Sequence, residues 1–165
     1  MAAEPGHDRW LGFLGEAEVI RRLAEVPELE LYRPFPDLEM VEVLARHHSS
    51  LRFLGLQVKA TSWVASRPQA HAGVEISTLR PDSSSFVVVL PWLAEGGRFA
   101  DECLLIPAAE VARRGTVDGR FYLIEFSLSS GRRRSRWDGF RVPLSSLGFQ
   151  VAELIAQPLA SRPVA

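Results

Sequence analysis

The sequence predicts an α/β fold in which helices flank a mixed central β-sheet. An amphipathic helical pattern comes first, a series of strand patterns follows, and helix and strand patterns then alternate. With 47% apolar and 24% charged residues, the chain is apolar enough to form a sizeable core and differs from a disordered chain. Its 165 residues are the usual length of one domain, so we expect a single domain over residues 1–165.

The first predicted element is a helix that begins after Asp8 and ends before Pro27. Apolar residues three or four positions apart predict the face of this helix that packs inward, namely Trp10, Phe13, Leu14, Ala17, Ile20 and Ala24. Gly12 and Gly15 each weaken the helix by about 1 kcal/mol relative to alanine, but they allow it to approach a sheet closely. Glu16 lies at the edge of the apolar face, where its carboxylate reaches either solvent or a polar cavity.

Strand patterns dominate the middle of the chain. The expected strands cover residues 29–33, 37–45, 51–61, 74–79, 86–90 and 102–106. A polar turn at 46–50 joins the second and third of them, and a loop or brief helical turn at 80–85 precedes the apolar run 86–90, which is typical of a fully buried strand. A helix over 107–114, strands over 121–128 and 139–142, and a helix over 144–157 complete the order.

Charge and composition exclude several functional classes. A net charge of −1 excludes a uniformly basic nucleic-acid coat but leaves room for a local basic patch. The single cysteine, Cys103, excludes an internal disulfide and a cysteine-based zinc cluster. The longest apolar run, 86–94, contains Pro91 and is too short to span a membrane, and the N-terminus lacks a signal-peptide pattern. We therefore expect a soluble cytoplasmic protein with no membrane partner.

One lysine, Lys59, stands among 18 arginines. A lysine amine is a compact charge that can lose its proton, whereas a guanidinium is planar and stays charged. Lys59 is therefore a candidate for a position that arginine cannot fill, and a surface lysine retained by chance is the alternative.

Three polar residues are expected to meet on the hairpin formed by the second and third strands. Gln57 and Lys59 are two positions apart and share a strand face, while Val58 points to the other face. A turn centred near residues 47 and 48 would place Asp37 opposite residue 57 or 59. An acid, an amide and an amine on an apolar hairpin require a partner such as a metal ion or a phosphate, or else form a structural polar cluster.

Asp37 after Pro36, the motif Gln57-x-Lys59 twenty positions later, and Gly15-Glu16 on the preceding helix resemble the PD-(D/E)xK phosphodiesterase superfamily. The glutamine variant resembles its Mrr-type branch. The resemblance covers a core of about residues 10–110, with C-terminal strands and a helix over about 111–160. It implies a restriction-endonuclease-like core and metal-dependent hydrolysis of nucleic acid.

The resemblance also implies roles for the individual residues. Asp37, the Gln57 side-chain oxygen and the Val58 carbonyl would hold Mg²⁺ (or Mn²⁺), and Glu16 would complete the site through a metal-bound water. Lys59 would orient or help to deprotonate the attacking water and offset the charge on the phosphate. Because Gln57 replaces an acid, either Glu39 or Glu42 could supply the missing charge, and a glutamate at position 57 is expected to tighten ion binding.

A basic cluster follows in the last third of the chain. Arg132, Arg133, Arg134 and Arg136 lie beside Trp137, between two predicted strands. We expect either a loop that grips phosphates, with Trp137 available for stacking, or a solvated hairpin tip.

These observations support three functional hypotheses. The first is a small bacterial metal-dependent endonuclease that acts on DNA, with a homodimer as the form that cuts two strands. The second is a nuclease-fold domain that has lost catalysis and serves as a nucleic-acid-binding or protein-interaction scaffold. The third is an α/β domain that binds a partner without contacting nucleic acid.

Overall fold

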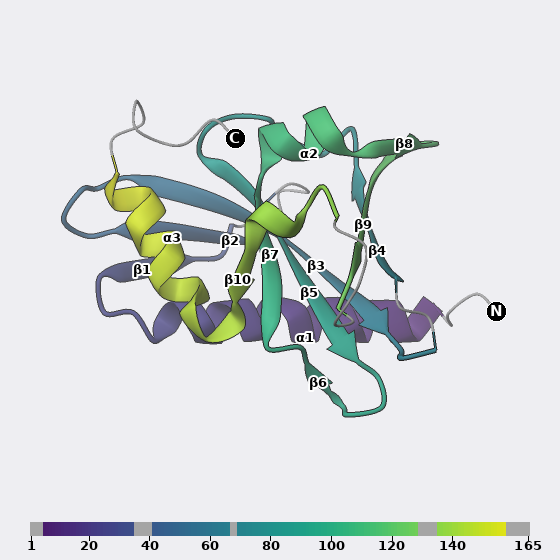
Figure 1. The fold of residues 1–165 in the computed structure, drawn as a ribbon. Coiled ribbons are helices and arrows are strands. Elements are labelled where there is room, and N and C mark those ends of the chain that lie inside the picture. Colours follow the sequence, from purple (N-terminus) through teal and green to yellow (C-terminus); the bar gives the residue numbers. More distant parts are fainter. Residues whose placement is uncertain (1–4, 35–40, 67–68, 129–134, 158–165) are drawn as a thin grey trace.

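The computed structural model describes residues 5–34, 41–66, 69–128 and 135–157, and it has the predicted α/β architecture (Figure 1). The larger sheet contains β1 (Leu29–Tyr32), β2 (Val43–His47), β3 (Phe53–Trp63), β5 (Ser85–Leu93), β6 (Arg98–Phe99), β7 (Glu102–Pro107) and β10 (Arg141–Pro143). The smaller sheet contains β4 (Gln69–Glu75), β8 (Thr116–Asp118) and β9 (Phe121–Ser127). The helices are α1 (Pro5–Ala24), α2 (Ala108–Arg114) and α3 (Leu147–Ala156), with short 3₁₀ turns η1 (Asp138–Phe140) and η2 (Leu144–Ser146).

The larger sheet is mixed, as predicted. Its strand order is β1-β2-β3-β5-β7-β10, with β6 paired to β5. β3 and β5 are parallel from Gly55 opposite Ser85 to Trp63 opposite Leu93, whereas the other pairs in the described residues are antiparallel. The connection between the two parallel strands contains β4, which leaves the larger sheet and pairs with β9 instead.

The two faces of the larger sheet belong to different cores. Val88 and Leu90 of β5 pack with residues of α1 and α3, whereas Val87 and Val89 pack with residues of β4, β9 and α2. β5 is therefore buried on both faces, which explains the continuous apolar run at 86–90. No helix in the described ranges is long and apolar enough to cross a membrane.

Glycines set the distance at which the helices pack. A Cβ added to Gly15 would lie 2.9 Å from the Cβ of Ala60, so α1 lies directly against β3 as expected. The same expectation is wrong for Gly12, where an added Cβ has no atom within 4 Å. A Cβ on Gly148 of α3 would overlap the Arg22 carbonyl of α1, which shows that these two helices are also in close contact.

Three predicted elements have boundaries that differ from those in the structure. The strand expected at 74–79 is β4 at Gln69–Glu75, and residues 76–78 form a turn. β4 buries alanine and valine at alternate positions, and small residues give a weak strand signal. The strand expected at 139–142 begins with η1, and the last helix begins with η2, so both start later than predicted.

Candidate active site beside the β2–β3 hairpin

The register of the β2–β3 hairpin differs from the predicted one. Val43 pairs with Leu56, and the Glu42 N–H donates to the Leu56 carbonyl at 3.0 Å, so the position beside Gln57 is Glu42. The register predicted from a turn centred at the two histidines is therefore wrong over the described residues of this hairpin. Asp37 itself lies outside the described residues, as does Glu39, and their proximity to a metal ion stays a prediction.

The turn explains the shift in register. The His47 N–H donates to the Arg52 carbonyl at 3.1 Å, and the Leu51 N–H donates to the His47 carbonyl at 2.9 Å. Leu51 adopts a left-handed conformation with φ of 55°, which is uncommon for a leucine. The loop is therefore centred about two residues later than the histidines suggested, and every opposed pair shifts accordingly.

Glu42 is the carboxylate that the structure places beside Lys59. One of its oxygens, Oε2, accepts a hydrogen bond from the Val58 N–H at 2.9 Å, and the other, Oε1, lies 3.8 Å from the Lys59 Nζ. Burial raises the pKa of Glu42, the neighbouring Lys59 charge and the Val58 N–H lower it, and the charge of Glu16 raises it; the net direction is upward. Of the two compensating acids considered from the sequence, Glu42 is thus in contact with the lysine.

The side chains of Lys59 and Val58 point to opposite faces of β3, as strand alternation predicts. Val58 is buried in the core that β3 shares with α1, whereas the Lys59 side chain remains 29% exposed on the other face. Because the N–H and C=O of one strand residue point to the same side, the Val58 carbonyl faces the side on which β2 has ended. The lysine amine, the Glu42 carboxylate and this carbonyl therefore meet at an accessible point of the sheet.

Glu16 reaches the same region from α1. Its neighbour Gly15 contacts Val58 and Ala60, and its negative charge contributes to the raised pKa of Glu42. The Glu16 carboxylate accepts a hydrogen bond from Arg33 Nη2 at 3.0 Å, at the end of β1. The sequence contains no signal for this arginine, because its partner lies 17 positions away on another element.

Gln57 has a different partner from the one predicted. It lies on the face of Lys59 but is only 4% exposed, and its Nε2 donates to Thr78 Oγ1 at 3.4 Å. Its Oε1 is buried with no hydrogen-bond partner in the described part of the protein. The amide is thus anchored by its nitrogen, and its oxygen is left for another ligand.

The oxygen atoms of Glu42, Gln57 and Val58 are of the chemical type that binds a hard divalent cation. The Glu42 carboxylate, the Gln57 Oε1 and the Val58 carbonyl are the ligand type that Mg²⁺ and Mn²⁺ prefer. Among the described residues no group of three or more His, Cys, Asp or Glu side chains could hold a metal ion. An ion here would therefore depend on amide and backbone oxygens and would keep several waters, as Mg²⁺ usually does.

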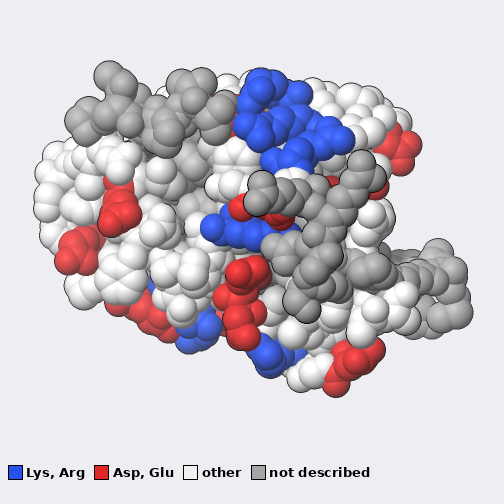
Figure 2. All heavy atoms as spheres, viewed as in Figure 1, with Lys and Arg blue, Asp and Glu red and all other residues white. Residues whose placement is uncertain are grey.

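The predicted basic cluster is only partly within the described residues. Arg132, Arg133 and Arg134 lie outside them, whereas Arg136 is exposed and donates to the Arg114 carbonyl at 2.6 Å. Arg114 in turn donates to the Arg136 carbonyl at 3.1 Å. Figure 2 shows basic side chains gathered where α2 lies in Figure 1, and α2 ends in Arg113 and Arg114.

Trp137 does not serve this cluster as predicted. Its side chain is 1% exposed and packs in the core formed with β4, β9 and α2. The expected stacking role is therefore wrong, because the indole is buried in the interior. Arg113 and Arg114, which the sequence analysis did not include in the basic cluster, lie in the last turn of α2, where Arg114 contacts Arg136.

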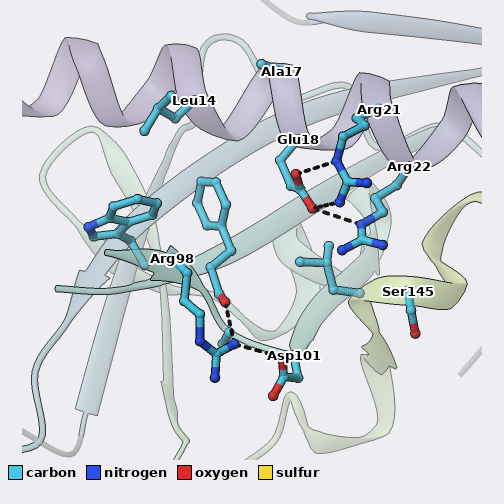
Figure 3. Close-up of a pocket in the computed structure, with 12 residues that line it drawn as sticks. Leu14, Ala17, Glu18, Arg21, Arg22, Arg98, Asp101 and Ser145 are labelled. Carbon is cyan, nitrogen blue, oxygen red and sulfur yellow. Dashed lines mark hydrogen bonds and ion pairs between the residues drawn. The ribbon is translucent and has the colours of Figure 1, made fainter. Parts of the chain in front are cut away.

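A separate cavity of about 710 Å³ lies between α1, β6 and η2, away from Lys59. Its wall is formed in part by apolar residues, among them Trp92 and Phe99, and in part by charged residues of α1 and of the segment around β6 (Figure 3). The carboxylate of Glu18 pairs with Arg21 and Arg22 at 2.8 Å, and Asp101 pairs with Arg98 at 2.8 Å. Its carboxylates are thus already neutralised by arginines, and none of the predicted site residues lines it.

No family model and no curated protein matches this chain. A solved structure of a bacterial homing endonuclease, I-Ssp6803I, is similar over 93% of this chain and 97% of the other, with a TM-score of 0.63 and 16% identity. The likeness shows a shared fold.

Proposed function

We propose that this protein is a metal-dependent nuclease of the PD-(D/E)xK type that hydrolyses phosphodiester bonds in DNA. The observation that carries the proposal is the pairing of the single lysine, Lys59, with the partly buried Glu42 at the end of the hairpin. The negative charge of Glu16, on α1 at the opposite face of β3, is close enough to contribute to the raised pKa of Glu42. The fold is similar to that of a homing endonuclease. The Mrr-like interpretation rests on Gln57 in the place of the second acid.

A divalent cation, Mg²⁺ or Mn²⁺, would be held by the Glu42 carboxylate, the Gln57 Oε1 and the Val58 carbonyl, with Asp37 as a further candidate ligand. When bound, the ion would supply Lewis-acid activation of a phosphate oxygen and of water. Glu16 would act through a water molecule, because its carboxylate also holds Arg33. Among the described ligands only Glu42 carries a negative charge. A site with two acidic ligands would supply twice that charge to the cation.

Lys59 performs two tasks in this proposal. Its ammonium group offsets the negative charge that develops on the phosphate during hydrolysis. Because the side chain is partly exposed, it can reach the phosphate backbone of a bound DNA strand. Its contact with Glu42 fixes the position of Nζ relative to the proposed ligands, so that the attacking water is held in a defined orientation. An arginine would keep the charge but is planar and bulkier, so it would place the charge elsewhere.

The arginines near α2 are proposed to contact DNA phosphates. Arg113 and Arg114 lie in the last turn of α2, and Arg114 contacts Arg136. Three further arginines occupy positions 132–134 of the sequence. Such contacts fix the position of a duplex without reading its sequence. Because one site cuts one strand, we also propose that two copies act together on duplex DNA, which light scattering with and without a DNA duplex would test.

A second candidate function is a nuclease-fold protein that binds DNA without cleaving it. The observation that favours it is the lack of any group of three acidic or histidine ligands among the described residues. Both candidates predict DNA binding that weakens steeply with salt. Only the first predicts cleavage that requires a divalent cation and Lys59.

The test is plasmid cleavage in Mg²⁺ or Mn²⁺ by the wild type and by Lys59→Ala, Lys59→Arg and Glu42→Gln, with thermal unfolding measured for each. Glu95→Gln, in the exposed turn after β5, is the matched control. We expect the three site variants to fold and to lose cleavage, with Lys59→Arg nearly as inactive as Lys59→Ala, while the control keeps full activity.

Two results would change this conclusion. Full cleavage by Lys59→Arg would remove the lysine from the mechanism. A wild-type protein that binds DNA but leaves the plasmid intact in both metals would favour the second candidate.

A further inference from the structure

Thr78, in the turn after β4, is a buried polar residue that packs against Gln57. Its hydroxyl donates to the Glu75 carbonyl at 3.1 Å, and the side chain is 8% exposed. A hydroxyl carries one proton, so the remaining capacity of Oγ1 is to accept. It accepts the hydrogen bond from Gln57 Nε2 at 3.4 Å.

This arrangement fixes which end of the Gln57 amide is held. The nitrogen is bound to Thr78, and the oxygen is left buried without a partner in the described part of the chain. A buried carbonyl oxygen in this state requires an electropositive partner.

Resting on the proposed function, we propose that Thr78 is a positioning residue that orients Gln57 with its Oε1 toward a divalent cation. It thereby makes a carboxamide, rather than a carboxylate, the side chain that fits position 57. The dependence on Thr78 follows from the single hydroxyl proton, which is already donated to the turn.

A glutamate at position 57 would face the lone pairs of the Thr78 hydroxyl, because the hydroxyl proton points to the Glu75 carbonyl. One of its oxygens would replace Nε2 at 3.4 Å from Oγ1, where two acceptors would face each other. The hydroxyl could turn toward the carboxylate only by releasing the Glu75 carbonyl. With Thr78 in this role, we expect Gln57→Glu to disturb this contact, so that its added charge would not simply tighten ion binding.

The experiment measures Mn²⁺ affinity by calorimetry for the wild type, Thr78→Val, Thr78→Ser and Gln57→Ala, each also tested for thermal unfolding without metal. Valine keeps the shape of threonine and removes the hydroxyl, whereas serine keeps the hydroxyl. Thr116→Val, on the exposed strand β8, is the matched control. Loss of a residue that orients a metal ligand typically weakens affinity at least tenfold, so we expect about a tenfold loss in Thr78→Val and wild-type affinity in Thr78→Ser.

A second measurement uses the metal-free wild type and needs no variant to fold. The Gln57 side-chain NH₂ should exchange with solvent far more slowly than that of Gln150, which is exposed on α3. Equal exchange rates for the two amides would overturn the proposed contact with Thr78.

The outcomes separate the two proposals. If Gln57→Ala weakens Mn²⁺ binding but Thr78→Val does not, the role of Thr78 is wrong and the proposed metal site stands. If the wild type binds no Mn²⁺, the metal-dependent function fails and the orientation of Gln57 toward a cation fails with it. If Gln57→Ala binds Mn²⁺ as tightly as the wild type, the role of Gln57 and of Thr78 is wrong, whereas a metal site formed by the other ligands stands.

Discussion

Replacing Gly15 by alanine would push α1 away from the sheet at the point where Glu16 reaches the site. The new Cβ would lie 2.9 Å from the Ala60 Cβ and 3.5 Å from a methyl carbon of Leu90 and of Val58. Carbon atoms pack favourably at about 3.5–4.0 Å, so the Ala60 contact must lengthen by about 0.6–1 Å. The contact is with a Cβ on the backbone of β3, which cannot swing aside as a long side chain can.

Two opposing terms decide the size of the effect. Alanine is about 1 kcal/mol better than glycine inside a helix. Overpacking a filled interior costs about 1–3 kcal/mol. The net expectation is a loss of about 1 kcal/mol, which lowers the Tm by about 2–4 °C for a chain of this size.

Gly12→Ala is the matched control, since the new Cβ has no atom within 4 Å and only the gain in helix propensity remains. Its Tm should rise by about 2–4 °C. Circular dichroism during heating measures both variants, and Ala60→Gly in the Gly15→Ala background should restore part of the loss. If both alanine variants were stabilised equally, the packing argument for α1 and for Glu16 would be refuted.

Three further predictions concern the turn, the acid and the basic surface. Leu51→Asn should raise the Tm by about 2–4 °C, because the left-handed conformation costs an ordinary side chain about 1–2 kcal/mol and asparagine tolerates it; Leu51→Ala, heated in parallel, should show no comparable gain. Burial raises the pKa of Glu42 in the folded protein above its ordinary 4.5, so this group favours the native state below about pH 4.5 and loses that contribution as the pH rises through the folded pKa. Glu42→Gln should therefore be more stable than the wild type at pH 7 and no more stable at pH 4 in metal-free thermal unfolding, and an unchanged difference across this range would contradict the assignment. Arg136→Ala should reduce the slope of log K against log salt for DNA binding by about 0.9, as measured by fluorescence anisotropy, and an unchanged slope would show that this side chain does not contact a phosphate.

The sequence predicts the elements whose patterns are strong and local. The buried run of β5, the short helix α2 after Pro107 and the alternation of Val58 and Lys59 all follow from apolar periodicity and turn residues. The hairpin register could not be obtained in this way, because it depends on the left-handed conformation of Leu51. No propensity favours leucine in such a position.

Within the candidate site, residue types were predictable but partners were not. The lone Lys59 and the edge position of Glu16 drew attention from the sequence alone. The contact of Lys59 with Glu42 required the register, and the contact of Gln57 with Thr78 required knowledge of how the connection after β4 folds back. Trp137 shows the converse, since an aromatic beside arginines suggested a surface role while packing places it inside.

The path of the chain between β3 and β5 has a consequence for the order in which the molecule can assemble. β4 lies in this connection, and its partner β9 is synthesised only after β5, β7 and α2. The β2–β3 hairpin with Glu42 and Lys59 can form early from neighbouring segments. The turn that carries Thr78 is anchored only once Phe121 of β9 has paired with Glu75 at the end of β4. A nascent chain would thus carry its lysine and its acid before the Gln57 amide is fixed, and maturation of the site would be among the last steps of folding.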